Sequence, residues 1–144
     1  TASYPVRVQA SEARTSQGLR DNLTAVLEMA DGSAATITYT SAGDKSFPRE
    51  YVEVFGGGLA ATIDNFKGSS IARGGKADRR RAWGVDRGHV AELAAFFAAL
   101  RQGHESPVAL QDYAATTLAT FAIEESLACR QPVAVDVNNL TCPA

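Results

Sequence analysis

The sequence predicts an α+β domain, in which an open, mainly antiparallel β-sheet is covered on one side by two C-terminal helices. Three observations lead to this prediction. Short segments between residues 23 and 73 alternate apolar and polar side chains, which is the period of a strand. Turn signals rich in glycine separate these segments. A helical apolar period begins only after Gly88, so strands come first and helices second, as in folds with segregated layers.

The predicted sheet begins with a strand over residues 4–10, in which Val6 and Val8 share a face, and a polar loop over residues 11–20 follows. A continuous antiparallel meander then occupies residues 21–73. Its strands are expected at residues 23–30, 35–40, 51–55, 59–64 and 69–73. Its tight turns are expected at Asp31-Gly32-Ser33, Gly56-Gly57-Gly58 and Lys67-Gly68. Residues 74–87, which are rich in glycine and arginine, are interpreted as a long loop or arm.

Two helices are predicted to follow this sheet. The first contains Leu93, Phe96, Phe97 and Leu100 at spacings i, i+3, i+4 and i+7, and Gly103 ends it as a C-terminal cap. The second begins with Asp112 as its N-cap, since an aspartate can accept a hydrogen bond from the free N–H groups of the first turn, and runs to about Arg130. A short strand over residues 132–135 closes the domain, and residues 137–144 form a tail.

Composition excludes several classes of function. A chain of 144 residues has the length of one domain. Its formal net charge of −2 provides no positive field that would attract nucleic acids, so we expect no nucleic-acid partner. No apolar run approaches the roughly 20 residues of a membrane span. Cys129 and Cys142 are interpreted as free thiols in a reducing compartment, which indicates a cytoplasmic protein. The Asn-x-Thr sequons at Asn22 and Asn139 are interpreted as chance matches.

Residues 56–61 match the letters of the dinucleotide fingerprint G-x-G-x-x-A. That motif binds a pyrophosphate only when a helix begins directly after the glycines. Here an alternating strand pattern follows instead, so the sequence favours a glycine hairpin. We therefore expect no cofactor to be bound by this chain.

Two clusters could bind a ligand. Arg79-Arg80-Arg81, with Arg73 and Lys76 nearby, could hold a carboxylate or phosphate, or could simply be a solvated loop. Trp83, Arg87 and His89 could line a sugar site, where the indole stacks and the polar groups bind hydroxyls; alternatively, Trp83 anchors a loop and His89 opens a helix. No Ser-His-Asp, Cys-His or metal-binding set can be assembled from residue spacing.

The order and spacing of several segments resemble the C-terminal domain of the Gfo/Idh/MocA oxidoreductase family over residues 1–136. In the first half these segments are Asp21-Asn22-Leu23, Asp31-Gly32-Ser33, Ile37-Thr38-Tyr39, Val52-Glu53-Val54-Phe55-Gly56 and Ile63-Asp64-Asn65-Phe66. In the second half they are Arg87-Gly88-His89-Val90-Ala91-Glu92-Leu93 with Phe96, Pro107 to Asp112, Ala115-Thr116-Thr117, Glu125-Ser126-Leu127 and Pro132-Val133. The chain is most similar to the branch in which this domain follows a zinc-type alcohol-dehydrogenase-like region.

The resemblance implies a domain that helps to bind a sugar, cyclitol or nucleotide sugar and that dimerises through its exposed sheet face. Hydride transfer would involve NAD or NADP held by a preceding Rossmann domain. That domain and its catalytic lysine are absent from this sequence, and the family's catalytic Asp/His pair lies before the first strand, so no catalytic residue is assigned. Arg87 stands where the family often has lysine.

We therefore expect a substrate-binding and homo-oligomerisation domain of an NAD(P)-dependent oxidoreductase, inactive by itself. The residues expected to contact its small-molecule substrate are Tyr39, Arg73, Trp83, Arg87 and His89. The alternative is a stand-alone, non-enzymatic dimerisation or ligand-binding module, for which an open two-sided sheet is equally suitable. A complete small isomerase that uses His89 is a third hypothesis.

Overall fold

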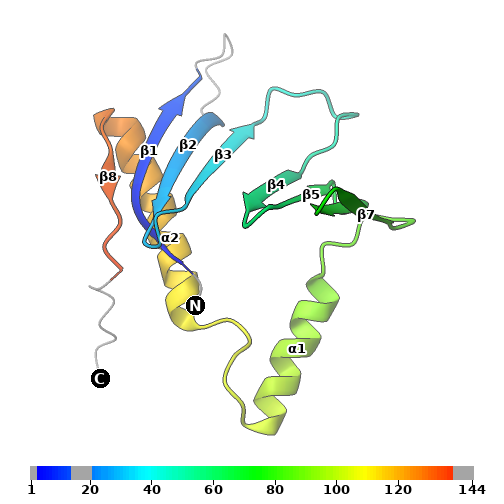
Figure 1. The fold of residues 1–144 in the computed structure, drawn as a ribbon. Coiled ribbons are helices and arrows are strands. Elements are labelled where there is room, and N and C mark those ends of the chain that lie inside the picture. The colour runs from blue at the N-terminus through cyan, green and yellow to red at the C-terminus, as the bar shows by residue number, and fades with distance from the viewer. Residues whose placement is uncertain (1–2, 14–20, 138–144) are drawn as a thin grey trace. The chain divides into compact units, whose positions relative to one another are not determined.

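The computed structural model describes residues 3–13 and 21–137, and it confirms the predicted α+β class with two four-stranded antiparallel sheets and two helices (Figure 1). The chain divides into two compact units. Unit 1 comprises Thr1–Ala42 and Glu105–Ala144, and unit 2 comprises Gly43–His104. The predictions for residues 14–20 and for the C-terminal tail, including Asn139 and Cys142, lie outside the described residues.

Unit 1 is a sheet with the strand order β3-β2-β1-β8. The strands are β1 (Pro5–Glu12), β2 (Asn22–Met29), β3 (Ala34–Thr40) and β8 (Val133–Ala134). Helix α2 (Leu110–Cys129) lies along β1 (Figure 1). The β2–β3 turn is the predicted one: Gly32 has a φ of 84°, and the backbone N–H of Ser33 donates to Asp31 Oδ1 at 3.0 Å.

The core of unit 1 forms where α2 meets the sheet. Val8, Ala10, Ala25 and Leu27 come from alternate positions of β1 and β2, and Val135 follows β8. From the helix come Ala115, Ala119, Ala122 and the buried Ser126, which recur every three or four residues and so lie on one helix face. These small side chains allow the helix backbone to approach the sheet closely. Val8 and Ser126 are completely buried.

Asn22, at the start of β2, is also buried, with 4% of its surface exposed. Its Oδ1 accepts hydrogen bonds from Thr40 Oγ1 at 2.6 Å and from the Ser41 backbone N–H at 3.2 Å. Its Nδ2 has no hydrogen-bond partner among the residues that the structure describes. The amide therefore joins the start of β2 to the end of β3.

Unit 2 is a sheet with the strand order β4-β5-β6-β7, followed by helix α1 (His89–Gln102). The strands are β4 (Tyr51–Gly56), β5 (Leu59–Asp64), β6 (Gly68–Arg73) and β7 (Lys76–Arg81). Tight turns connect them, centred on Gly57-Gly58, Asn65-Phe66 and Gly74-Gly75, and Lys67 lies between the second turn and β6. Both residues of each turn have φ between 47° and 75°, which is the type I′ geometry that matches strand twist. The glycine segment is therefore a hairpin, as predicted.

Three predictions about the elements are wrong. Residues 76–81 form strand β7 and no arm, because the type I′ turn at Gly74-Gly75 folds them back onto β6. The meander is two sheets, because the long connection after Thr40 is no tight turn and β3 and β4 are not paired. Asp112 lies within the first turn of α2, and Ala109 occupies the N-cap position without a side-chain hydrogen bond.

Helix α1 has the predicted bounds, and Gly103, with a φ of 66°, caps its end by donating its backbone N–H to the carbonyls of Ala99 and Leu100. Its apolar stripe, in contrast, is open to solvent: the four side chains are between 45% and 64% exposed. Helix α2 covers its sheet as expected, whereas α1 packs closely against none of the strands of unit 2. Within the described residues, neither helix has the length and hydrophobicity needed to cross a bilayer.

Candidate functional site

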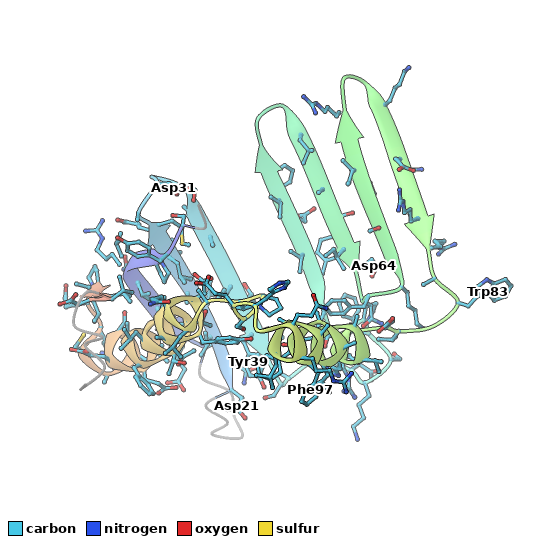
Figure 2. All side chains as sticks on the ribbon, turned by 90° about the horizontal axis from the view of Figure 1, so that it is seen from below. Asp21, Asp31, Tyr39, Asp64, Trp83 and Phe97 are labelled. Carbon is cyan, nitrogen blue, oxygen red and sulfur yellow. The ribbon has the colours of Figure 1, made fainter. Side chains whose placement is uncertain are left out.

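The five residues predicted to bind substrate fall in both units. Tyr39 lies in β3 of unit 1. In unit 2, Arg73 ends β6, Trp83 follows β7, Arg87 precedes α1 and His89 is the first residue of α1. Figure 2 labels Tyr39 and Trp83 among the side chains. The surroundings of each candidate therefore have to be considered within its own unit.

Tyr39 lines a hollow of about 480 Å³ at one end of the unit 1 sheet. Leu23 pairs with Glu12 on one side and with Tyr39 on the other, so all three side chains share the sheet face on which α2 lies. Glu124, Leu127 and Ala128 from the last turns of α2 form the other wall, and Asp21 completes the rim. An aromatic ring beside three carboxylates suits a polyhydroxylated ligand, since carboxylates accept hydrogen bonds from hydroxyls and rings stack on C–H surfaces.

Sequence analysis missed the acidic residues of this hollow, Glu12, Asp21 and Glu124. They are separated by up to 112 positions in the chain, and only the strand register and the position of α2 bring them together. A second hollow of about 600 Å³ lies on the other side of the same helix end and shares Glu12, Leu127 and Ala128 with the first. The C-terminal end of α2 thus borders both hollows.

Arg87 is the candidate with the best defined position. Its Nη2 donates to Glu50 Oε1 and Oε2, both at 3.0 Å, and its Nε donates to Oε1 at 3.3 Å. Its guanidinium carbon lies 5.9 Å from the ring centroid of Phe66, within the range of a cation–π contact. The side chain is 37% exposed. Through these two contacts the arginine joins the start of β4 and the β5–β6 turn to the segment that precedes α1.

The remaining unit 2 candidates are Arg73, Trp83 and His89. Trp83 is fully exposed on the segment between β7 and α1. Arg73 pairs across the β6–β7 hairpin with Lys76. Among the described residues, no hydrogen bond or ion pair joins Arg73, Trp83 or His89 to another candidate. Their assignment to a substrate site stays a prediction.

The glycine segment of unit 2 does not fit a dinucleotide. Gly57 and Gly58 form the two central positions of a hairpin turn, and strand β5 begins at Leu59, where the fingerprint requires a helix. No helix N-terminus therefore points at the position of a pyrophosphate. In the described part of the chain, no group of three or more His, Cys, Asp or Glu residues could hold a metal ion.

No protein-family model matches the sequence, and no curated protein is significantly similar to it. Solved structures match the fold closely. An oxidoreductase from Agrobacterium radiobacter, in complex with NAD+, L-tartaric acid and magnesium, matches with a TM-score of 0.75 at 15% identity, over 92% of this chain and 44% of its own. Aldose-aldose oxidoreductase from Caulobacter crescentus matches with a TM-score of 0.73 at 18% identity, over 92% and 42%.

A levoglucosan dehydrogenase, in complex with NADH and L-sorbose, matches with a TM-score of 0.74 at 16% identity, over 92% of this chain and 45% of its own. The chain thus spans less than half the length of each of these three oxidoreductases. At these identities the comparison concerns the fold. The chain has the fold of one part of such an oxidoreductase, as its resemblance to the C-terminal domain of the Gfo/Idh/MocA family predicts.

Proposed function

We propose that this chain is the substrate-binding and oligomerisation domain of a cytoplasmic NAD(P)-dependent oxidoreductase that acts on a hydroxyl of a sugar, cyclitol or nucleotide sugar. The observation that supports this proposal is the fold match over 92% of the chain to oxidoreductases more than twice its length. Two of those proteins have sugar-related names or ligands, and two are complexes with NAD+ or NADH. Residues 1–136 would form the domain, with the cofactor held by a separate Rossmann domain.

In this proposal the chain supplies binding groups and no catalytic residue. The hollow beside Tyr39 provides three carboxylates and a phenol ring, a combination that recognises hydroxyl groups. Unit 2 supplies Arg73, Trp83, Arg87 and His89 as further candidates. NAD or NADP, bound elsewhere, would accept or deliver the hydride, so the isolated chain should have no dehydrogenase activity.

The test is an assay of the full-length product of the gene. Reduction of NAD+ or NADP+ is followed with a panel of aldoses, cyclitols and nucleotide sugars, with this 144-residue chain as a parallel sample. The proposal predicts turnover by the full-length protein and none by the chain alone. In the full-length protein, Tyr39→Ala should raise the KM for the sugar at least tenfold with an unchanged KM for the cofactor, whereas Tyr113→Ala, similarly exposed on α2, should change neither.

A stand-alone dimerisation or ligand-binding module is the second candidate function. The exposed faces of the unit 2 sheet favour it, because large unpartnered surfaces mark sites of association. A gene product without a dinucleotide-binding segment, inactive with every substrate of the panel, would support the module and contradict the oxidoreductase.

A further inference from the structure

The arginine run of β7 has no part in the proposed substrate site. Because residues 79–81 lie in a strand, their side chains alternate between the two faces of the unit 2 sheet. The register places Arg80 in one row with Ser69 of β6 and Ile63 of β5, and residues in one row share a face. Arg79 lies in the neighbouring row and therefore on the opposite face. The three arginines thus form no single cluster, and Arg80 belongs with the side chains of its own face.

A hollow of about 280 Å³ lies on this face, at the end of the sheet that Asp64 marks in Figure 2. We call it the β7 hollow. Its apolar part consists of Ile63, Phe66 and Ala82, and its polar part includes Lys67, Ser69 and Arg80. The Ala82 backbone N–H donates to the Lys67 carbonyl at 2.8 Å, which connects the end of β7 to the β5–β6 turn. Segments on both sides of the hollow are thereby held together.

The charge of the β7 hollow is positive. Lys67, Arg80 and Arg81 line it, and none of the carboxylates among the described residues does. Asp78 lies 3.8 Å from Arg80, but the two side chains are 71% and 83% exposed, so this ion pair contributes little. Lys67 and Arg81 make no ion pair within the described part of the chain. An anion in the hollow would therefore meet cations without displacing a strong partner.

Phe66 supplies an aromatic wall to the hollow from an unusual backbone position. Its φ is 52°, in the left-handed region that favours glycine, and the preceding Asn65 has a φ of 47°. Bulky residues are uncommon there, and such outliers are found preferentially at ligand sites. The Arg87 guanidinium, which binds Glu50, lies 5.9 Å from the centroid of the Phe66 ring and helps to fix its position. The turn thus holds an aromatic ring beside cations at a position better suited to glycine.

We propose that the β7 hollow binds a small aromatic acid, a single ring that carries a carboxylate or a phosphate. The ring lies against Phe66 and Ile63, since aromatic rings pair in stacked or edge-to-face contacts. The acid group accepts hydrogen bonds from Arg80, Lys67 and the Ser69 hydroxyl, because guanidinium and ammonium groups donate strongly to carboxylate and phosphate oxygens. A volume of about 280 Å³ is just below the roughly 300–1,000 Å³ of sites for drug-sized ligands, which limits the occupant to one ring.

Two simpler explanations account for less of the hollow. A solvated edge strand explains the charges of β7, since edge strands often carry them, but it explains neither the conformation of Phe66 nor the apolar part of the hollow. An inorganic anion would satisfy the cations and leave Phe66 and Ile63 uncovered. The β7 hollow belongs to unit 2, whereas the hollow beside Tyr39 belongs to unit 1, so this inference does not depend on the proposed function.

The test is an NMR titration of the 144-residue chain with phenyl phosphate and, separately, with benzoate. Amide signals of residues 66–69 and 80–82 should shift with either probe, and the probe that binds more tightly identifies the preferred acid group. Inorganic phosphate, which has no ring, and benzyl alcohol, which has no charge, should each bind at least tenfold more weakly than the better acid. Added salt should weaken binding of the acids and leave benzyl alcohol unaffected.

Two variants separate the contributions of charge and ring. R80A should weaken phenyl phosphate binding about tenfold, whereas R79A, its neighbour on the opposite face, is the matched control and should change nothing. F66G keeps the turn, because glycine accepts its backbone conformation, and should reduce phenyl phosphate binding to the level of inorganic phosphate. Circular dichroism verifies the folding of each variant. Equal binding of phenyl phosphate and inorganic phosphate, equal losses in R79A and R80A, undiminished binding by a folded F66G, or no shift at residues 66–69 and 80–82 would each overturn the inference.

Discussion

The two units of this chain contain sheets of equal strand number with opposite degrees of burial. In unit 1, α2 covers the sheet and every buried residue of the described chain lies there. In unit 2, all of whose residues the structure describes, no residue is buried. The charges differ as well: unit 1 has four Lys/Arg and nine Asp/Glu residues, a net −5, whereas unit 2 has ten and seven, a net +3. Unit 1 is built around its own core, whereas unit 2 leaves most of its large apolar side chains exposed.

The helices explain this difference. The buried face of α2 consists of Ala115, Ala119, Ala122 and Ser126, whose small side chains let the helix approach β1. Helix α1 instead presents Leu93, Phe96, Phe97 and Leu100, which are large and exposed. An amphipathic stripe in a sequence therefore predicts a helix reliably, but it does not identify the surface that the stripe will cover.

The largest expected effect of a single substitution is in the core of unit 1. Val8→Ala removes two methyl groups from a completely buried site and should lower the free energy of unfolding by about 2–3 kcal/mol. Val54→Ala removes the same atoms from a side chain that is 56% exposed and should cost less than about 0.5 kcal/mol. Urea unfolding followed by circular dichroism measures both. Equal losses would contradict the contrast between the units.

A smaller loss is expected at Ser126. Its hydroxyl donates to the Gln131 carbonyl at 2.7 Å and accepts from the Ala10 backbone N–H at 2.9 Å, which connects the end of α2 to β1. Ser126→Ala leaves the buried Ala10 N–H without this acceptor and should destabilise by about 1–3 kcal/mol. Hydrogen exchange should show faster exchange of the Ala10 amide. Ser69→Ala, at an exposed position of β6, is the control and should have no effect on stability.

A still smaller, pH-dependent effect is expected from the ion pair between Arg7 and Glu28, which are about half exposed. The hydrogen bond from Arg7 lowers the pKa of Glu28. A carboxylate with a lowered pKa stabilises the fold at neutral pH, and that stabilisation is lost as the pH falls through its folded-state pKa. Glu28→Gln should therefore flatten the acid side of the stability profile, and added salt should reduce the difference between variant and wild type. An unchanged acid limb would show that the pair contributes nothing.

No effect on stability is expected at Trp83, the only tryptophan, whose indole is fully exposed in unit 2. Trp83→Phe should unfold at the same urea concentration as the wild type. In the wild type the fluorescence should be that of an indole in water and open to quenching by acrylamide. If the indole of the isolated chain were protected from acrylamide, this part of unit 2 would be covered, and much of the contrast between the units would disappear.

Local patterns predicted most of the elements. The Gly57-Gly58 hairpin, the turn at Gly32 and the cap at Gly103 were predictable because each depends on a residue that accepts positive φ. The same reasoning could have found β7, since Gly74-Gly75 is a two-residue turn signal between Arg73 and Lys76; the high charge of residues 76–81 suggested a loop instead. An exposed edge strand tolerates such charge.

The candidate sites were less predictable. Tyr39 was selected from its residue type, but its neighbours Glu12 and Glu124 come from a distant strand and helix. The partners of Arg87, Glu50 and Phe66, are likewise fixed by tertiary structure. Composition and spacing report on local conformation, whereas a binding site depends on contacts between residues far apart in the chain.

The burial of Asn22 has a practical consequence for producing this protein. Asn22-Leu23-Thr24 is an acceptor sequon, yet its amide nitrogen lies in the interior and is inaccessible to a transferase once β2 is in place. In a eukaryotic secretory host, glycan addition could occur only on the unfolded chain, and the sugar would then keep Asn22 from Thr40. Secretion would thus divide the product into a folded, unglycosylated form and a glycosylated form that cannot complete its sheet, so a bacterial cytoplasm is the better choice of host.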